Sequence, residues 1–177
     1  MDAAIARRKL CPDHSLMRSK LNLFTFLASV AGIGFIPFMP GTFGSLAALG
    51  IYLLLPGWLF SGTGLLWYAA GLLGFSVLAA LISTKAEKTL GHDAGSIVID
   101  EVAGYLLCVI WMPHNWLVGV YAFVLFRVFD IAKPWPVKQS QSLPAGWGVV
   151  IDDLLAGVYT MILLQILLKI YPKFFGL

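Results

Sequence analysis

Long apolar segments separated by short breaks make up most of this chain. Proline and glycine mark several of the breaks, as at Pro40-Gly41, Pro56-Gly57 and Pro113. Because a helix needs about 20 mostly apolar residues to cross a bilayer, the pattern predicts an all-α, polytopic membrane bundle of five or six apolar helices. The apolar segments extend over residues 21–39, 43–60, 63–83, 97–112, 115–130 and 149–170.

Charged residues are too few and too unevenly placed for a soluble protein. Hydrophobic residues make up 59% of the 177 residues, and charged residues make up 12%. No Asp, Glu, Lys or Arg occurs in the 64 residues from Leu21 to Thr84 or in the 25 residues from Val102 to Phe126. This composition excludes a disordered chain, a coiled coil and an ordinary soluble enzyme. It leaves a membrane enzyme, a small transporter and a membrane scaffold open.

The net charge of +3 comes from the N-terminal part of the chain. Residues 1–20 contain five basic and two acidic residues, whereas the rest of the chain contains seven of each. The positive-inside rule therefore predicts a basic amphipathic arm over residues 1–20 at the cytoplasmic membrane surface, followed by a membrane-embedded domain over residues 21–177. Aromatic residues do not alternate with these basic residues, so we expect the bilayer as a partner and no nucleic acid.

Two topologies fit the apolar pattern. If residues 21–39 cross the membrane fully, Lys85 and Lys88 lie outside, which the positive-inside rule disfavours. If this first segment is re-entrant, the basic stretches between the later segments face the cytoplasm. Loops 56–63 and 113–116, which contain no Lys or Arg, then face outward. We favour the re-entrant arrangement.

Most acidic residues lie at the edges of apolar segments, where an unpaired charge costs several kcal/mol. Residues 99–105 resemble residues 151–157, because each stretch has two adjacent acids followed by small residues. Small residues let helices approach closely, so we expect the two acid pairs to converge. Solvated helix ends stabilised by the helix dipole are the alternative interpretation. The six edge acids are Asp93, Asp100, Glu101, Asp130, Asp152 and Asp153.

A cluster of carboxylates needs a compensating cation, and the residue types favour Mg²⁺. Carboxylate oxygens are the ligands that Mg²⁺ prefers, and the ion usually also binds phosphate oxygens of a substrate. The three histidines and two cysteines do not have the spacing of a zinc site. All six edge acids are therefore candidate metal ligands.

The basic residues after the fifth apolar segment predict a phosphate-binding corner. Arg127 and Asp130 are three residues apart, so they share a face of a helix, and Lys133 follows. Arginine offers a two-pronged donor and lysine a point charge, and both bind phosphate. An ion pair at a helix end is the alternative.

Two further polar stretches are candidates for the same site. Residues 40–45 precede an apolar helix and could cradle an anion with backbone N–H groups, aided by Thr42 and Ser45. In the alternative interpretation, one of these two hydroxyls caps the helix. His92 is a candidate proton donor to a leaving group, although a loop histidine without such a role is the commoner case.

The absence of nucleophile motifs and the presence of basic residues with the carboxylates indicate the reaction class. The sequence contains no Gly-x-Ser-x-Gly nucleophile elbow and no cysteine placed beside a histidine as a nucleophile pair. Metal-assisted attack of water on phosphorus fits the acids and bases best. A cation- or proton-coupled transporter and a structural membrane subunit are the alternatives from other classes.

Four blocks of sequence, in this order, resemble the bacterial phosphatidylglycerophosphatase A family. They are PGTFGSL at 40–46, HDAGSIVIDEVAG at 92–104, FRVFDIAKPWP at 126–136 and GVVIDDLLAG at 148–157. The resemblance implies an all-helical enzyme of the bacterial inner membrane. The re-entrant topology, with several passes, predicts that its active site faces the cytoplasm. The resemblance also implies Mg²⁺-dependent hydrolysis of phosphatidylglycerophosphate to phosphatidylglycerol and phosphate, in phospholipid biosynthesis.

The resemblance implies that the acids and bases in these blocks form the active site, and we assign their roles as expectations. The catalytic candidates are Asp100, Glu101, Asp153 and His92, with Glu101 expected to orient the attacking water. The candidate metal ligands are Asp93, Asp100, Glu101, Asp130, Asp152 and Asp153. The candidate substrate-binding residues are Thr42, Ser45, Arg127 and Lys133.

Overall fold

The computed structural model describes residues 22–92, 94–141 and 146–176. Within these residues the fold is all-helical, with seven α-helices, three 3-10 helices and no strand, which confirms the all-α prediction. The elements are α3 (Leu23–Ala28), η1 (Ile33–Phe35), α4 (Pro40–Leu54), η2 (Gly57–Phe60), α5 (Gly64–Leu90), α6 (Ile99–Cys108), α7 (Trp116–Ala132), α8 (Val137–Ser140), α9 (Gly146–Ile170) and η3 (Pro172–Phe175).

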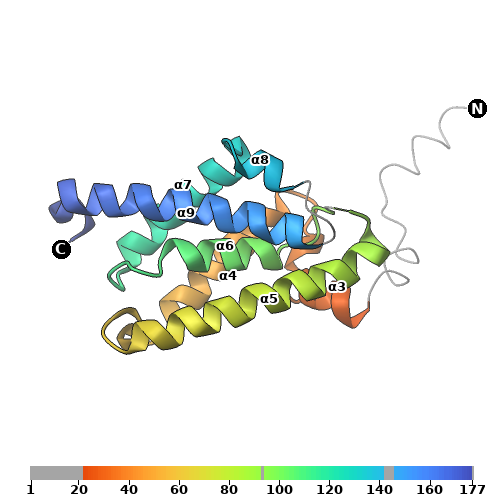
Figure 1. The fold of residues 1–177 in the computed structure, drawn as a ribbon, viewed down its shortest axis with the longest axis horizontal. Coiled ribbons are helices and arrows are strands. Elements are labelled where there is room, and N and C mark those ends of the chain that lie inside the picture. The colour runs from red at the N-terminus through yellow and green to blue at the C-terminus, as the bar shows by residue number, and fades with distance from the viewer. Residues whose placement is uncertain (1–21, 93, 142–145, 177) are drawn as a thin grey trace, which may run out of the picture.

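The long helices run side by side along one axis, and α6 packs against α4, α5 and α9 (Figure 1). The starts of α4, α6 and α9 lie at the same end of the bundle as the C-terminal ends of α5 and α7, on the right in Figure 1. We call this the acidic end, because the acid pairs of α6 and α9 belong to it. The turns that follow α4 and α6 lie at the opposite end, together with the C-terminus.

Two of these helices, α5 and α9, are long and apolar enough to cross a membrane, as judged by length and composition. The expectation of five or six such helices is therefore met only in part. Helix α4 is apolar but has 15 residues, and α6 has ten. The apolar pattern overestimated helix length because apolar residues continue into the turns. The segment over residues 97–112 is one example, since its helix ends at Cys108.

The first apolar segment does not form a continuous helix. Helix α3 has six residues and begins with a capping box between Asn22 and Thr25. Val30, Ala31 and Gly32 then adopt positive φ angles, and a 3-10 turn follows. These left-handed φ angles end the helix and turn the backbone sharply. For the non-glycine residues among them, this conformation costs free energy. Of our two topologies, the full crossing would use a continuous helix over residues 21–39, which the structure does not have, and the re-entrant arrangement stays a prediction.

Thr42 and Ser45 do not cap helix α4. Helix α4 is preceded by Met39, which makes no side-chain capping bond, so Thr42 lies within the first turn. Ser45 lies further along α4, and its hydroxyl donates to the Gly41 carbonyl oxygen of the same helix at 2.9 Å. The capping alternative for these two residues is therefore wrong, because α4 begins several residues earlier than the apolar pattern suggested.

Helices α6 and α9 approach each other closely at two glycines. A Cβ atom at Gly104 would lie 2.6 Å from the carbonyl oxygen of Asp153, and one at Gly157 would lie 2.5 Å from the carbonyl oxygen of Gly104. Both distances are too short for a side chain. This crossing is where the two related acid-containing stretches meet, as their small residues predicted.

We expect Gly157→Ala to destabilise the protein by about 1–3 kcal/mol, because the new methyl group meets backbone that cannot swing away. Unfolding of the purified protein by heat measures this change. Gly74→Ala in α5 is the matched control, since a Cβ there meets nothing within 4 Å. Equal melting temperatures for the two variants would show that the close crossing does not limit stability.

Candidate functional site

Three carboxylates from two helices come together at the acidic end. Asp100 and Glu101 lie in the first turn of α6, and Asp153 lies inside α9. One oxygen from each side chain lies within 4.8 Å of the others. Asp100 is 3% exposed and Asp153 is 4% exposed. We call these three residues the carboxylate triad.

The sequence left two interpretations of the acid pairs open, a converging cluster and solvated helix ends. The positions of the acids in their helices distinguish between them. The first-turn location of Asp100 and Glu101 suits the helix dipole of α6. Helix α9 begins at Gly146 and has no acidic residue in its first turn. The interpretation as solvated helix ends is therefore wrong for Asp152 and Asp153. Both residues lie beyond the first turn of α9, and their side chains are buried in the bundle.

Two cations border the triad, and each is held by its own carboxylate. Arg127 donates from Nη1 to Asp130 at 2.6 Å, and the same nitrogen lies 3.4 Å from the Ser45 hydroxyl. Lys133 donates from Nζ to Asp152 at 2.5 Å. The ion pair expected between Arg127 and Asp130 is present, and it lies beside the triad rather than at an isolated helix end.

Lys133 occupies an unusual backbone position that aims its side chain at α9. It terminates α7 with a φ angle of 41°, in the left-handed region. Burial lowers the pKa of its ammonium group, but the hydrogen bond and charge of Asp152 outweigh burial, so the pKa is raised overall. Lys133 therefore stays positively charged at neutral pH and can bind an anion.

Negative charge exceeds positive charge at this site. The carboxylates of Asp130 and Asp152 interact electrostatically with the triad, so among the described residues the site has five acids and two bases. Buried charges of one sign need a counter-charge. A divalent cation would supply the missing positive charge.

The donor set of the triad fits a magnesium ion. All candidate ligand atoms are carboxylate oxygens, which are the ligands that Mg²⁺ takes. The Glu101 Oε2 atom is buried and has no hydrogen-bond partner. A buried acceptor without a partner costs free energy, and a bound cation would remove that cost.

Two other buried polar atoms near the triad also lack partners. They are the Nε atom of Arg127 and the Oγ1 atom of Thr42. A phosphate oxygen could accept a hydrogen bond from either one. The structure brings Ser45 and Arg127 together, and Gly41, which precedes Thr42, lies against Glu101 of the triad.

Not every candidate residue converges with the triad. Asp152, the partner of Lys133, borders the triad but lies outside the group of three possible ligands. His92 pairs with Glu87, its Nδ1 atom 2.9 Å from the Glu87 carboxylate, and its side chain is 64% exposed. Asp93 lies outside the described residues. The roles assigned to these residues, like those assigned to the other candidates, stay predictions.

Sequence reasoning missed the contribution of Gly41 to this site. A Cβ atom there would overlap the Glu101 carboxylate and lie 3.1 Å from Nη1 of Arg127. The absence of a side chain at Gly41 leaves room for both charged groups. A glycine in the first turn of a helix, where other residues have better propensity, was the signal that could have found it.

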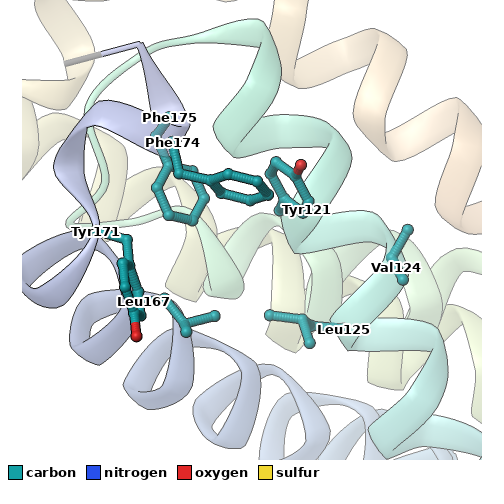
Figure 2. Close-up of a pocket in the computed structure, with 7 residues that line it drawn as sticks. All are labelled: Tyr121, Val124, Leu125, Leu167, Tyr171, Phe174 and Phe175. Atoms are coloured by element: carbon teal, nitrogen blue, oxygen red, sulfur yellow. The ribbon is translucent and has the colours of Figure 1, made fainter.

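A pocket at the opposite end of the bundle has the wrong chemistry for hydrolysis. It lies between α7 and the end of α9, and has a volume of about 380 Å³ (Figure 2). Aromatic and aliphatic side chains line it, and none of them is a carboxylate or a base. The lining residues are Tyr121, Val124, Leu125, Leu167, Tyr171, Phe174 and Phe175.

Comparisons with known proteins identify the family of this chain. The family model of phosphatidylglycerophosphatase A matches residues 26–168, which include every described candidate residue. The chain belongs to the phosphatidylglycerophosphatase A family. Members of this family are phosphatases that act on a phosphate monoester, so this chain is an enzyme of that class.

Relatives of known sequence cover most of the chain. A phosphatidylglycerophosphatase A of Escherichia coli is 35% identical over 158 residues, which are 84% of this chain and 88% of that protein. One from Haemophilus influenzae is 38% identical over 149 residues, covering 81% and 88% of the two chains. A Bacteroides thetaiotaomicron protein with the provisional name phosphatidylinositol-3-phosphatase is 40% identical over 144 residues, covering 76% and 87%. No solved structure was found to match this phosphatidylglycerophosphatase A family member.

Proposed function

We propose that this protein removes the terminal phosphate from phosphatidylglycerophosphate, producing phosphatidylglycerol and inorganic phosphate, with Mg²⁺ as its cofactor. The observation that carries the proposal is the carboxylate triad beside two cations at one end of an apolar helical bundle. Such a site can hold a metal ion and a phosphate group together. The names of the Escherichia coli and Haemophilus influenzae relatives support the choice of lipid.

The triad residues Asp100, Glu101 and Asp153 would hold Mg²⁺. The chemistry that such an ion would supply when bound is polarisation of a phosphoryl oxygen and easier ionisation of water. Glu101 has an oxygen without a protein partner, and we assign it the task of orienting the attacking water. Attack of that water on phosphorus forms a new P–O bond and breaks the bond to the glycerol oxygen, which then takes up a proton.

Arg127 and Lys133 would bind the terminal phosphate. Their carboxylate partners, Asp130 and Asp152, fix the positions of both side chains. Hydrolysis removes about 1.5–2 negative charges from the lipid. The two bases therefore hold the product more weakly than the substrate, which favours product release.

The site is expected to face the cytoplasm. We propose a multi-pass protein of the bacterial inner membrane in which α5 and α9 cross the bilayer. The basic residues Lys85, Lys88 and Lys133 then lie at the acidic end, where the positive-inside rule expects them. The phosphate of a membrane lipid reaches the same level without leaving the bilayer.

A transporter is the less favoured function. Transporter acids belong near the bilayer midplane at broken helices, whereas the triad lies at the end of the bundle where α6 begins. Family membership also favours a phosphatase.

Phosphate release from a short-chain phosphatidylglycerophosphate tests the proposal. We expect the purified protein to release phosphate in the presence of Mg²⁺. Removal of the metal by EDTA should slow release by at least about tenfold until Mg²⁺ is restored. Unchanged activity in EDTA would contradict the metal assignment.

The lipid specificity is tested with a second substrate. The Bacteroides thetaiotaomicron relative makes phosphatidylinositol 3-phosphate the informative competitor. We expect a higher kcat/KM for phosphatidylglycerophosphate than for this competitor. The opposite order would move the proposal to an inositol lipid phosphatase that uses the same site.

A further inference from the structure

An apolar surface lies directly beside the two phosphate-binding cations. Val128 and Ile131 share one face of α7 and are 54% and 66% exposed. Trp135 follows the end of α7 and is 76% exposed. We call these three residues the apolar rim. It belongs to the C-terminal end of α7, at the acidic end of the bundle (Figure 1).

The charged and apolar residues alternate along the last turns of α7. Arg127 and Asp130 are three residues apart and so share one face of the helix, as do Val128 and Ile131. Adjacent residues of a helix are about 100° apart, so the apolar face lies next to the charged face. Lys133 and Trp135 continue the same alternation beyond the end of the helix.

Trp135 is exposed, yet polar contacts fix its position. The Tyr159 hydroxyl of α9 donates to the Trp135 carbonyl oxygen at 2.8 Å. When the Gln139 amide is turned so that its oxygen faces the indole, that oxygen lies 3.3 Å from Nε1 of Trp135. The backbone of Trp135 is therefore held against α9, while its side chain stays exposed to what surrounds the described residues.

The geometry of a membrane lipid explains this combination. A terminal phosphate bound by Arg127 and Lys133 is joined through a glycerol and a phosphodiester to the diacylglycerol of the same lipid. The apolar part of that diacylglycerol must leave the site sideways into the bilayer. Tryptophan prefers the membrane interface, where its ring contacts apolar groups and its N–H contacts polar groups. The apolar rim provides such a contact next to the phosphate.

We propose that Val128, Ile131 and Trp135 contact the diacylglycerol part of the lipid substrate and guide its phosphate to Arg127 and Lys133. This inference rests on the proposed function and adds the surface that recognises the apolar part of the substrate. The rim acts in binding and makes no contact with the reacting phosphorus. Its loss should therefore raise KM and leave kcat almost unchanged.

The experiment compares two chain lengths of phosphatidylglycerophosphate, one dioleoyl lipid in mixed micelles and one water-soluble dihexanoyl lipid. For Trp135→Ala we expect KM for the dioleoyl lipid to rise about tenfold, because tens of Å² of apolar contact are lost. We expect KM for the dihexanoyl lipid, and kcat for both lipids, to change less than about twofold. Trp135→Phe should restore most of the long-chain KM.

Matched variants separate the rim from general effects on membrane binding. Trp116→Ala changes a tryptophan of α7 that is 63% exposed at the opposite end, and we expect wild-type kinetics. Ile131→Ser should reproduce the Trp135→Ala phenotype without altering the 133–136 turn. Phe38 lies just before the start of α4 and is 72% exposed. Phe38→Ala tests whether this residue, rather than the apolar rim, contacts the diacylglycerol.

Three outcomes would overturn this inference while leaving the proposed function intact. The first is an active wild-type enzyme with the same KM increase for both chain lengths in Trp135→Ala. The second is no KM increase in either Trp135→Ala or Ile131→Ser. The third is a chain-length effect from Phe38→Ala alone. Absence of phosphate release by the wild-type protein would instead contradict the proposed function.

Discussion

Asp153→Asn is expected to lower kcat/KM for phosphatidylglycerophosphate by about 10²–10³-fold, because it removes one of three carboxylates that can bind the metal. Asp153 is buried beside Asp100 and Glu101, so water cannot replace the lost ligand easily. Asparagine keeps an oxygen but not the charge. Raising the Mg²⁺ concentration should therefore recover part of the activity, which a titration of rate against Mg²⁺ measures.

The same substitution should not weaken folding in the absence of metal. Within the described part of the chain, the site has five acids and two bases, and removing one buried negative charge relieves repulsion. Thermal unfolding in EDTA should show Asp153→Asn to be at least as stable as the wild type. Asp13→Asn, which lies outside the described residues, is the control with the same chemical change and should retain wild-type activity. A metal-free variant that unfolds more easily would mean that the activity loss reflects folding instead.

The apolar pattern predicted the helices better than it predicted their ends. Helices α5 and α9 follow from long apolar runs. By contrast, α6 ends at Cys108 although apolar residues continue to Met112. Hydropathy reports transfer from water and contains no information on where a buried backbone turns. The break after α3 depends on positive φ angles at Val30 and Ala31, which their residue types do not announce.

The sequence predicted which residues gather at the site better than it predicted their partners. The similar stretches 99–105 and 151–157 correctly placed two acid pairs on adjacent helices, because small residues at matching positions let the helices approach. They could not show that Asp152 faces Lys133 while Asp153 joins the triad. Adjacent residues point about 100° apart on a helix, and only the packing of α9 fixes which one turns toward α6.

Gly41→Ala is expected to lower kcat/KM by about 100-fold, since misplacement of a catalytic group by about 1 Å has an effect of that size. The new methyl group would overlap the Glu101 carboxylate and crowd the Arg127 guanidinium. Both obstacles are the ends of flexible side chains, which can swing away. The substitution therefore moves two site residues without forcing the backbone to shift.

Stability distinguishes this effect from damage to the fold. Alanine has a better helix propensity than glycine by up to about 1 kcal/mol, so the melting temperature of Gly41→Ala should not fall. Gly50→Ala lies on the same helix, where a Cβ meets nothing within 4 Å, and it should keep both activity and stability. We expect a large loss of activity in Gly41→Ala alone, at an unchanged melting temperature. This result would show that the Glu101 and Arg127 side chains need the space beside Gly41. Equal activity of the two variants would show that the Glu101 and Arg127 side chains can be displaced without loss. The assignment of Glu101 as the residue that orients the attacking water would then be wrong.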